Sequence, residues 1–244
     1  MTNIDTLIFD IGDTLYHSNT NLVANNLKFL AELGLKGSKE FTEELIACAI
    51  KEVGDGWLHD YMLEHNVDEY WEPSREIWVE YDRKFLEILG VEGNLDKLAD
   101  DLQTKWDEFI AAKRTPLVNG ARQTVEELHS REYKLGIASN RFGDPRVLLE
   151  REDLKKFFGS IEYTNVPGYK KPSPYMLLKV AIELGSNPRR CAYVGNMVEF
   201  DVVSAQSADM MPILVTYCNP EQEDLAPEDA VILGEISNLL DSFQ

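Results

Sequence analysis

The chain has 244 residues, 44% of them hydrophobic and 27% charged, which is enough apolar material for a sizeable core in one or two domains. Its formal net charge of -19 argues against nucleic acid and anionic membrane surfaces as partners, because both are bound through clustered Lys and Arg. The sequence shows neither an apolar run of membrane-spanning length nor a secretory leader, so we expect a cytoplasmic protein.

The chain opens with a short apolar segment, Ile4 to Phe9, that predicts a buried parallel strand ending at Asp10. Ligands of open α/β sheets collect at the carboxyl ends of such strands, so this carboxylate is a candidate nucleophile. An aspartate in that position could take up a phosphoryl group and divide a hydrolysis into two displacements. Thr14 could donate a hydrogen bond to Asp10 or to the loop.

Helical periodicity dominates the next hundred residues and predicts a helical bundle. The expected helices are Leu22 to Leu33, Phe41 to Val53, Ile77 to Leu89 and Leu95 to Ile110. Gly34 and Gly90 stand just past two of these segments, where glycine commonly ends a helix. The stretch Gly54-Asp55-Gly56 predicts a flexible loop.

From Pro116 the pattern changes to alternating strands and helices, which is typical of a parallel sheet. The expected strands are Leu135 to Ala138, Ile161 to Tyr163, Ala192 to Val194, Ile213 to Thr216 and Ala230 to Ile232. The sequence therefore predicts an α/β fold with a parallel Rossmann-like sheet in residues 1–15 and 116–244, and an inserted all-helical domain in residues 16–115. Three widely spaced cysteines predict reduced structural thiols instead of a disulfide framework or a zinc site.

Four short segments occur in an order that points to one family. They are Asp10 to Thr14, Ser139 after a predicted strand, Lys171 directly before Pro172, and Val194 to Asp201. Together they resemble the haloacid dehalogenase-like (HAD) hydrolase superfamily, in its capped phosphatase and dehalogenase-type branch with a helical cap after the first strand. The resemblance implies that Asp10 is the nucleophile, that Lys171 offsets negative charge, and that Ser139 holds a phosphate oxygen.

The same resemblance implies a substrate site and a magnesium site. Thr14, the backbone of Asn140, Gly12 and His17 are expected near the substrate. The expected metal ligands are Asp10, the carbonyl of Gly12, Asn196 and Asp201. The substrate class that this branch implies is a small phosphorylated metabolite, such as a sugar phosphate or a phosphoglycolate-like acid.

Two positions depart from the phosphatase pattern. Gly12 stands where the family's phosphatases carry a second aspartate that acts as general acid and base, so we expect slow turnover unless Asp13 or His17 substitutes. Asn196 replaces another aspartate, which predicts weaker magnesium binding because one negative charge is missing.

These losses leave two alternatives open: a catalytically weak or inactive binding or scaffold protein, and a 2-haloacid dehalogenase. Dehalogenases of the family lack the second aspartate and need no metal, but they carry a halide-binding arginine soon after the first segment. In this chain the first arginine is Arg75, and Leu177 stands where those enzymes have a tyrosine. We therefore favour a phosphatase.

Overall fold

The computed structural model describes residues 4–18 and 20–243. The chain divides into two compact units, one formed by residues 1–18 with 115–244 and the other by residues 19–114. We call the first the core unit and the second the helical unit. Within the described residues, no helix combines the length and the apolar character that crossing a bilayer requires.

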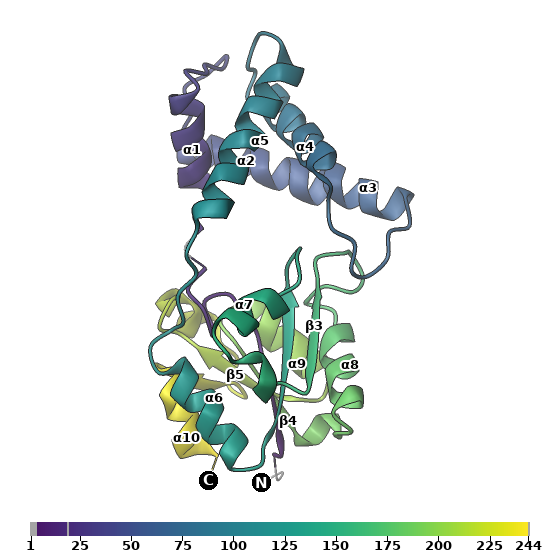
Figure 1. The fold of residues 1–244 in the computed structure, drawn as a ribbon, viewed down its shortest axis with the longest axis vertical. Helices are drawn as coiled ribbons and strands as arrows, with labels where there is room; N and C mark the ends of the chain where they lie inside the picture. The colour runs from purple at the N-terminus through teal and green to yellow at the C-terminus, as the bar shows by residue number, and fades with distance from the viewer. Residues whose placement is uncertain (1–3, 19, 244) are drawn as a thin grey trace. The chain divides into compact units, whose positions relative to one another are not determined.

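The core unit is built on one parallel sheet (Figure 1). Within the described residues its six strands are ordered β3-β2-β1-β4-β5-β6, and every neighbouring pair is parallel. Their bounds are β1 Thr6–Phe9, β2 Lys134–Asn140, β3 Ser160–Thr164, β4 Cys191–Gly195, β5 Met211–Val215 and β6 Val231–Leu233. The predicted parallel α/β sheet is confirmed, and each strand lies within two residues of its expected bounds.

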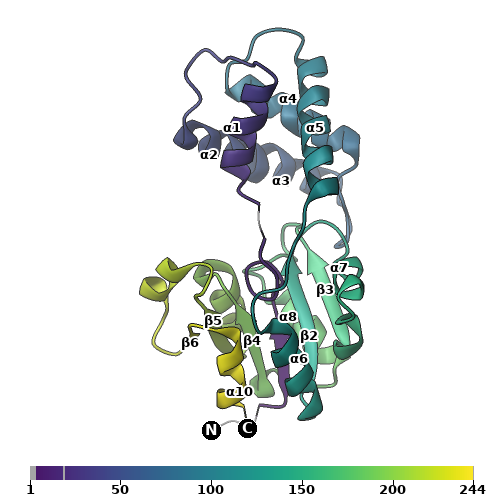
Figure 2. The same cartoon turned by 60° about the vertical axis from the view of Figure 1, so that its left-hand side comes forward.

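Helices cover both faces of this sheet because the side chains of each strand alternate between the faces. Leu7 and Phe9 of β1 pack into one apolar cluster, whereas Ile8 between them packs into the other. Figures 1 and 2 show α6 and α10 together on one face and α8 on the other. The helices are α6 Ala121–Ser130, α7 Arg146–Arg151, α8 Tyr175–Glu183, α9 Val203–Ser207 and α10 Leu239–Ser242.

Shorter helical turns complete the core unit. They are a π-helical turn at Val198–Val202 and 3-10 turns at Lys155–Phe157, Pro188–Arg190, Pro220–Leu225 and Ile236–Asn238. The strand order reverses direction between β1 and β4, and a reversal of this kind is where open α/β sheets bind their ligands. Asp10 follows β1 and Asn196 follows β4, so both lie at that reversal.

The helical unit packs around its own apolar core, which includes Phe29, Ile46, Phe85 and Leu102. Its helices are α1 Leu22–Glu32, α2 Glu43–Lys51, α3 His59–Glu64, α4 Arg75–Ile88 and α5 Leu95–Ala112. The loop expected at Gly54 to Gly56 is wrong, because a π-helical segment at Glu52–Leu58 joins α2 directly to α3. Val53 and Leu58 of that segment are buried, so packing overrides the weak helix propensity of its two glycines.

Candidate active site

One buried ammonium lies between two buried carboxylates at the carboxyl ends of β1 and β4. Lys171 Nζ is 2.8 Å from Asp10 Oδ1 and 2.6 Å from Asp201 Oδ1. Asp10 retains 7% of its surface exposed, and Lys171 and Asp201 retain 2% each. The structure thus brings together three residues that the sequence places 161 and 30 positions apart.

The charges of this cluster depend on one another. Burial alone would lower the pKa of Lys171, but the carboxylates of Asp10 and Asp201 outweigh burial and hold that pKa above its ordinary value. Lys171 therefore stays protonated, and its charge offsets the repulsion between the carboxylates. Two negative charges and one positive charge leave the cluster with one net negative charge. Burial raises the pKa of Asp10 above its ordinary value, while the Lys171 ammonium and a side-chain hydrogen bond from the buried Ser139 oppose that rise and favour the carboxylate.

Tyr193 completes the surroundings of the ammonium. Lys171 Nζ donates to Tyr193 Oη over 2.8 Å, and Tyr193 Oη donates to the carbonyl of Ala138 over 2.7 Å. All three ammonium protons thus have an acceptor: Asp10, Asp201 and Tyr193. Burial and the nearby Asp201 raise the pKa of Tyr193 well above its usual range, so the phenol stays protonated. Sequence reasoning missed this residue, because it lies within a strand that reads as apolar.

Asn140 fixes the backbone that carries Lys171. Its Nδ2 donates to the Lys171 carbonyl over 2.9 Å, and its Oδ1 accepts from the Lys171 backbone N–H over 2.7 Å. Two hydrogen bonds from one side chain restrict both the position and the orientation of that peptide. The sequence suggested the backbone of Asn140 as a substrate contact, and the structure gives its side chain a separate part in positioning Lys171.

The loop after β4 is organised around Asp201. Asp201 Oδ2 accepts from the backbone N–H groups of Asn196 and Met197, each over 2.9 Å. A Cβ at Gly195 would lie 2.3 Å from Asp201 Cγ, so only glycine allows this close approach. Thr14 Oγ1 lies 3.5 Å from Asn196 Oδ1 and donates to it, which links the loop after β1 to the loop after β4.

Comparisons with known proteins show the family of this chain. A family model described as "haloacid dehalogenase-like hydrolase" matches residues 4–209, a span that contains every residue of the cluster. The chain belongs to this family of hydrolases. The expected resemblance is confirmed, and the protein is an enzyme of the hydrolase class.

Individual relatives of this haloacid dehalogenase-like hydrolase are distant. A glyceraldehyde 3-phosphate phosphatase from Methanothermobacter thermautotrophicus is 24% identical over 241 residues, which cover 96% of each chain. A crystal structure described as a predicted phosphoglycolate phosphatase from Haemophilus somnus 129pt matches over the whole of both chains, with a TM-score of 0.66 and 16% identity. The magnesium-bound HAD-hydrolase YfnB from Bacillus subtilis covers 99% of both chains, with a TM-score of 0.60 and 18% identity. At these identities the two structures support the fold alone.

The structure leaves space for a side chain at Gly12 of this hydrolase. Apart from Gly12 itself and its two chain neighbours, no described residue has a heavy atom within 4 Å of a Cβ added there, and the glycine has no positive φ, so a side chain would fit without backbone strain. The neighbouring Asp13 accepts hydrogen bonds from Ser18 N and Ser18 Oγ over 2.9 and 2.6 Å. His17 Nδ1 lies 3.5 Å from Cys218 Sγ. Asp13 and His17, the two suggested substitutes for the missing acid, thus have hydrogen-bond partners in Ser18 and Cys218, which are not residues of the charged cluster around Lys171.

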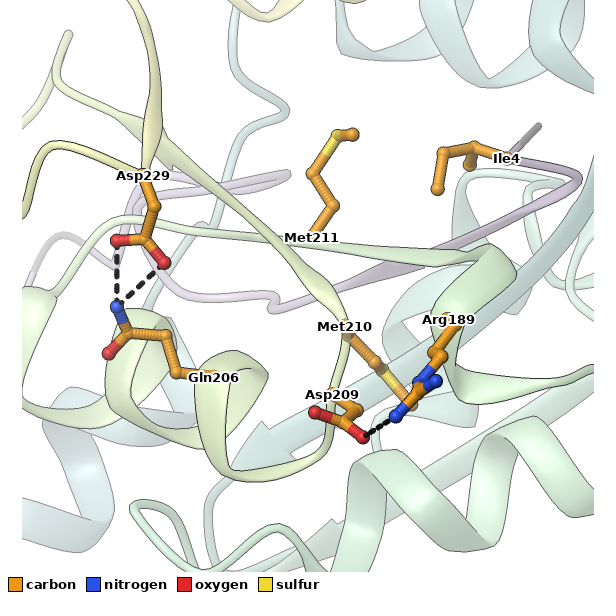
Figure 3. Close-up of a pocket in the computed structure, with 7 residues that line it drawn as sticks. All are labelled: Ile4, Arg189, Gln206, Asp209, Met210, Met211 and Asp229. Carbon is orange, nitrogen blue, oxygen red and sulfur yellow. Dashed lines mark hydrogen bonds and ion pairs between the residues drawn. The ribbon is translucent and has the colours of Figure 1, made fainter. Parts of the chain in front are cut away.

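A shallow pocket of about 370 Å³ lies at the opposite, amino-terminal ends of β1, β4 and β5 (Figure 3). Figure 3 shows its two polar pairs: Arg189 with Asp209 at 3.3 Å, and Gln206 with Asp229 at 2.9 Å. Arg189 and Asp209 have side chains that are 74% and 70% exposed, so their ion pair contributes little energy. The buried charged cluster, and not this pocket, is the candidate active site.

Proposed function

We propose that this hydrolase is a phosphatase that forms an aspartyl-phosphate on Asp10. The observation that carries the proposal is the buried ammonium of Lys171, held between Asp10 and Asp201 where the strand order reverses. A fixed cation beside a carboxylate nucleophile offsets its repulsion with an anionic phosphate ester. The likeness to a glyceraldehyde 3-phosphate phosphatase along 96% of the chain supports the same chemistry.

In the proposed first step, a carboxylate oxygen of Asp10 attacks phosphorus, and the bond from phosphorus to the leaving alcohol oxygen breaks. The leaving oxygen takes up a proton from solvent water, because Gly12 has no side chain to supply one. Water then attacks phosphorus of the phosphoryl-Asp10 and loses a proton to solvent, the bond from phosphorus to the Asp10 oxygen breaks, and inorganic phosphate leaves as the carboxylate is restored. Ser139 holds a phosphate oxygen, whereas Asn140 keeps Lys171 in position through its backbone.

We propose that Mg²⁺ binds at this site. The cluster carries one net negative charge, so a phosphate dianion needs an additional cation to approach it. Asp10, Asn196 Oδ1 and the carbonyl of Gly12 supply the oxygen ligands that magnesium prefers. Asp201 would contribute a further carboxylate to this set, while its two oxygens also accept hydrogen bonds from Lys171 and from the loop after β4. Bound magnesium would offset charge on the transferring phosphoryl group.

Slow turnover is part of the proposal. Gly12 has no side chain to exchange a proton with the leaving oxygen, and general acid–base help contributes roughly a hundredfold to ten-thousandfold to such reactions. Asn196 supplies a neutral oxygen where an aspartate would supply a charge, which weakens the attraction for magnesium. The enzyme would therefore function with incomplete acid–base catalysis.

We further propose that the substrate is a small phosphorylated metabolite, such as a sugar phosphate or a phosphoglycolate-like acid. The helical unit, residues 19–114, would act as the cap domain that selects it, because it is inserted directly after the segment that carries Asp10. Loops and inserted domains on a rigid scaffold commonly determine specificity, while the scaffold positions the reacting groups.

Phosphate release from a panel of phosphomonoesters, with and without Mg²⁺, tests the proposal. We expect magnesium-dependent release that Asp10→Asn abolishes, with an unchanged circular dichroism spectrum. Lys170→Ala serves as the matched control, because Lys170 precedes the buried lysine but belongs to no part of the charged cluster. Chloride release from a 2-haloacid would instead support a dehalogenase, and silence in both assays would support a binding or scaffold protein.

A further inference from the structure

Three potential metal ligands converge in the core unit: Asp13 and His17 from the segment after β1, and Cys218 from the segment after β5. One ligating atom from each lies within 4.8 Å of the others. His17 and Cys218 are 201 positions apart in the chain, yet their Nδ1 and Sγ atoms are 3.5 Å apart. None of the three belongs to the charged cluster around Lys171.

We propose that Asp13, His17 and Cys218 bind a divalent transition-metal ion of the zinc type, with water as the fourth ligand. In a tetrahedral zinc site, Zn–N of about 2.1 Å and Zn–S of about 2.3 Å separate nitrogen and sulfur by about 3.6 Å. The 3.5 Å between His17 Nδ1 and Cys218 Sγ matches that separation. Three protein ligands with one open position are a common arrangement for zinc.

The donor set determines which metal is favoured. A thiolate and an imidazole favour Zn²⁺ or Co²⁺, whereas Mg²⁺ prefers oxygen ligands alone. The proposed magnesium site around Asp10 and Asn196 consists of oxygen donors, so the two sites would select different ions. The zinc-type site rests on its own three side chains and does not depend on the proposed phosphatase activity.

Hydrogen bonds from Ser18, which is not one of the three proposed ligands, orient the carboxylate of Asp13. Ser18 N donates to Asp13 Oδ1 over 2.9 Å, and Ser18 Oγ donates to Asp13 Oδ2 over 2.6 Å. Partners of this kind fix the orientation of a metal-binding carboxylate and leave its further lone pairs for an ion. Asp13 itself has a φ of +53°, an uncommon backbone conformation for a residue other than glycine.

Two rival explanations predict different behaviour. A purely structural thiol would donate a hydrogen bond to the His17 ring and would bind no ion. A nucleophilic thiolate would need a lowered pKa, whereas burial and the Asp13 carboxylate raise the pKa of the Cys218 thiol. A bound divalent cation would displace the thiol proton in spite of that raised pKa, and its charge would offset the negative charges of the thiolate and of Asp13.

The test is a Co²⁺ titration of the reduced, metal-free full chain in buffer with excess Mg²⁺, read by thiolate-to-cobalt charge-transfer absorption. We expect saturation at one equivalent and displacement by Zn²⁺. Cys218→Ser should abolish the band, and His17→Gln should weaken binding by at least about a hundredfold. Cys48→Ser is the matched control, because Cys48 is an exposed thiol of the helical unit, and it should leave the band unchanged.

No thiolate band in the wild type, or an equal band in Cys218→Ser, would overturn the proposal. If Cys218→Ser does not fold, as judged by circular dichroism, His17→Gln and Asp13→Asn provide the test, and unchanged affinity in both would also overturn it. If the wild-type protein shows the cobalt band but releases no phosphate from any phosphomonoester, the result would count against the proposed function alone. The two proposals can therefore fail separately.

Discussion

Lys171→Ala removes the ammonium that lies between two buried carboxylates. In the wild type, Lys171 Nζ contacts Asp10 at 2.8 Å and Asp201 at 2.6 Å, with all three residues more than nine-tenths buried. Truncation leaves both carboxylates in a low-dielectric environment without a counter-charge. It also leaves the Tyr193 hydroxyl without its donor.

Breaking a buried ion pair by removing one partner costs about 3 to 5 kcal/mol of unfolding free energy. For a domain of this size, each kcal/mol changes the melting temperature by about 2 to 4 °C, so we expect a decrease of about 6 to 20 °C at pH 7. Burial already raises the pKa of Asp10 and Lys171 lowers it, so the pKa of Asp10 rises further in the folded variant without the ammonium. The variant's deficit should therefore shrink as the pH falls toward about 4, where the unfolded carboxyls also become protonated.

Thermal melting of wild type, Lys171→Ala and Lys170→Ala between pH 4 and pH 8 measures this effect. Lys170→Ala should melt within a few degrees of wild type, because surface changes are usually within about 0.5 kcal/mol. An equal melting temperature for all three proteins at pH 7 would refute the electrostatic reasoning. A deficit in Lys171→Ala that does not change with pH would show lost packing as the cause.

Three further predictions concern other positions. Gly12→Asp with Asn196→Asp should release phosphate up to roughly a hundredfold faster, with a steeper magnesium dependence; a folded, magnesium-binding double variant no faster than wild type would contradict this. Burial and the nearby Asp107 raise the pKa of Asp82, which is 4% exposed. The folded state therefore favours the protonated carboxyl of Asp82, so this contribution to the free energy of unfolding is fully present below about pH 4 and is lost as the pH rises. Asp82→Asn should thus stabilise the helical unit at pH 7 by about 1 to 3 kcal/mol, and an unchanged melting curve would argue against an ionisable buried carboxyl. Tyr193→Phe should lower the free energy of unfolding by about 1 to 3 kcal/mol, because the Lys171 ammonium loses an acceptor and the buried Ala138 carbonyl loses its donor. A wild-type free energy of unfolding in denaturant would contradict this prediction.

The strands could be predicted because a strand buried on both faces is a continuous apolar run. The segment predicted at Ala192 to Val194 is the centre of β4, Cys191–Gly195. The first strand placed Asp10 at the carboxyl edge of the sheet, and the family resemblance implied that Lys171 offsets negative charge there; the structure brings the two within 2.8 Å of each other.

The remaining features depend on contacts that local patterns do not encode. Tyr193 reads as one more apolar residue of a strand, and only the folded structure places its hydroxyl against Lys171. The π-helical segment at Glu52–Leu58 contains two glycines, which locally favour a loop, and packing of its buried residues decides otherwise. The cysteine spacing predicted structural thiols and no zinc site, whereas the site we propose pairs Cys218 with His17 from a loop 201 positions away, so that spacing carried no signal of it.

The most direct measurement of the central claim is mass spectrometry of acid-quenched enzyme during turnover of its best phosphomonoester with Mg²⁺. The peptide that contains Asp10 should be heavier by one phosphoryl group in the wild type and unmodified in Asp10→Asn, which should also release no phosphate. Steady phosphate release by Asp10→Asn, or a phosphoryl group trapped on another residue, would contradict Asp10 as the nucleophile.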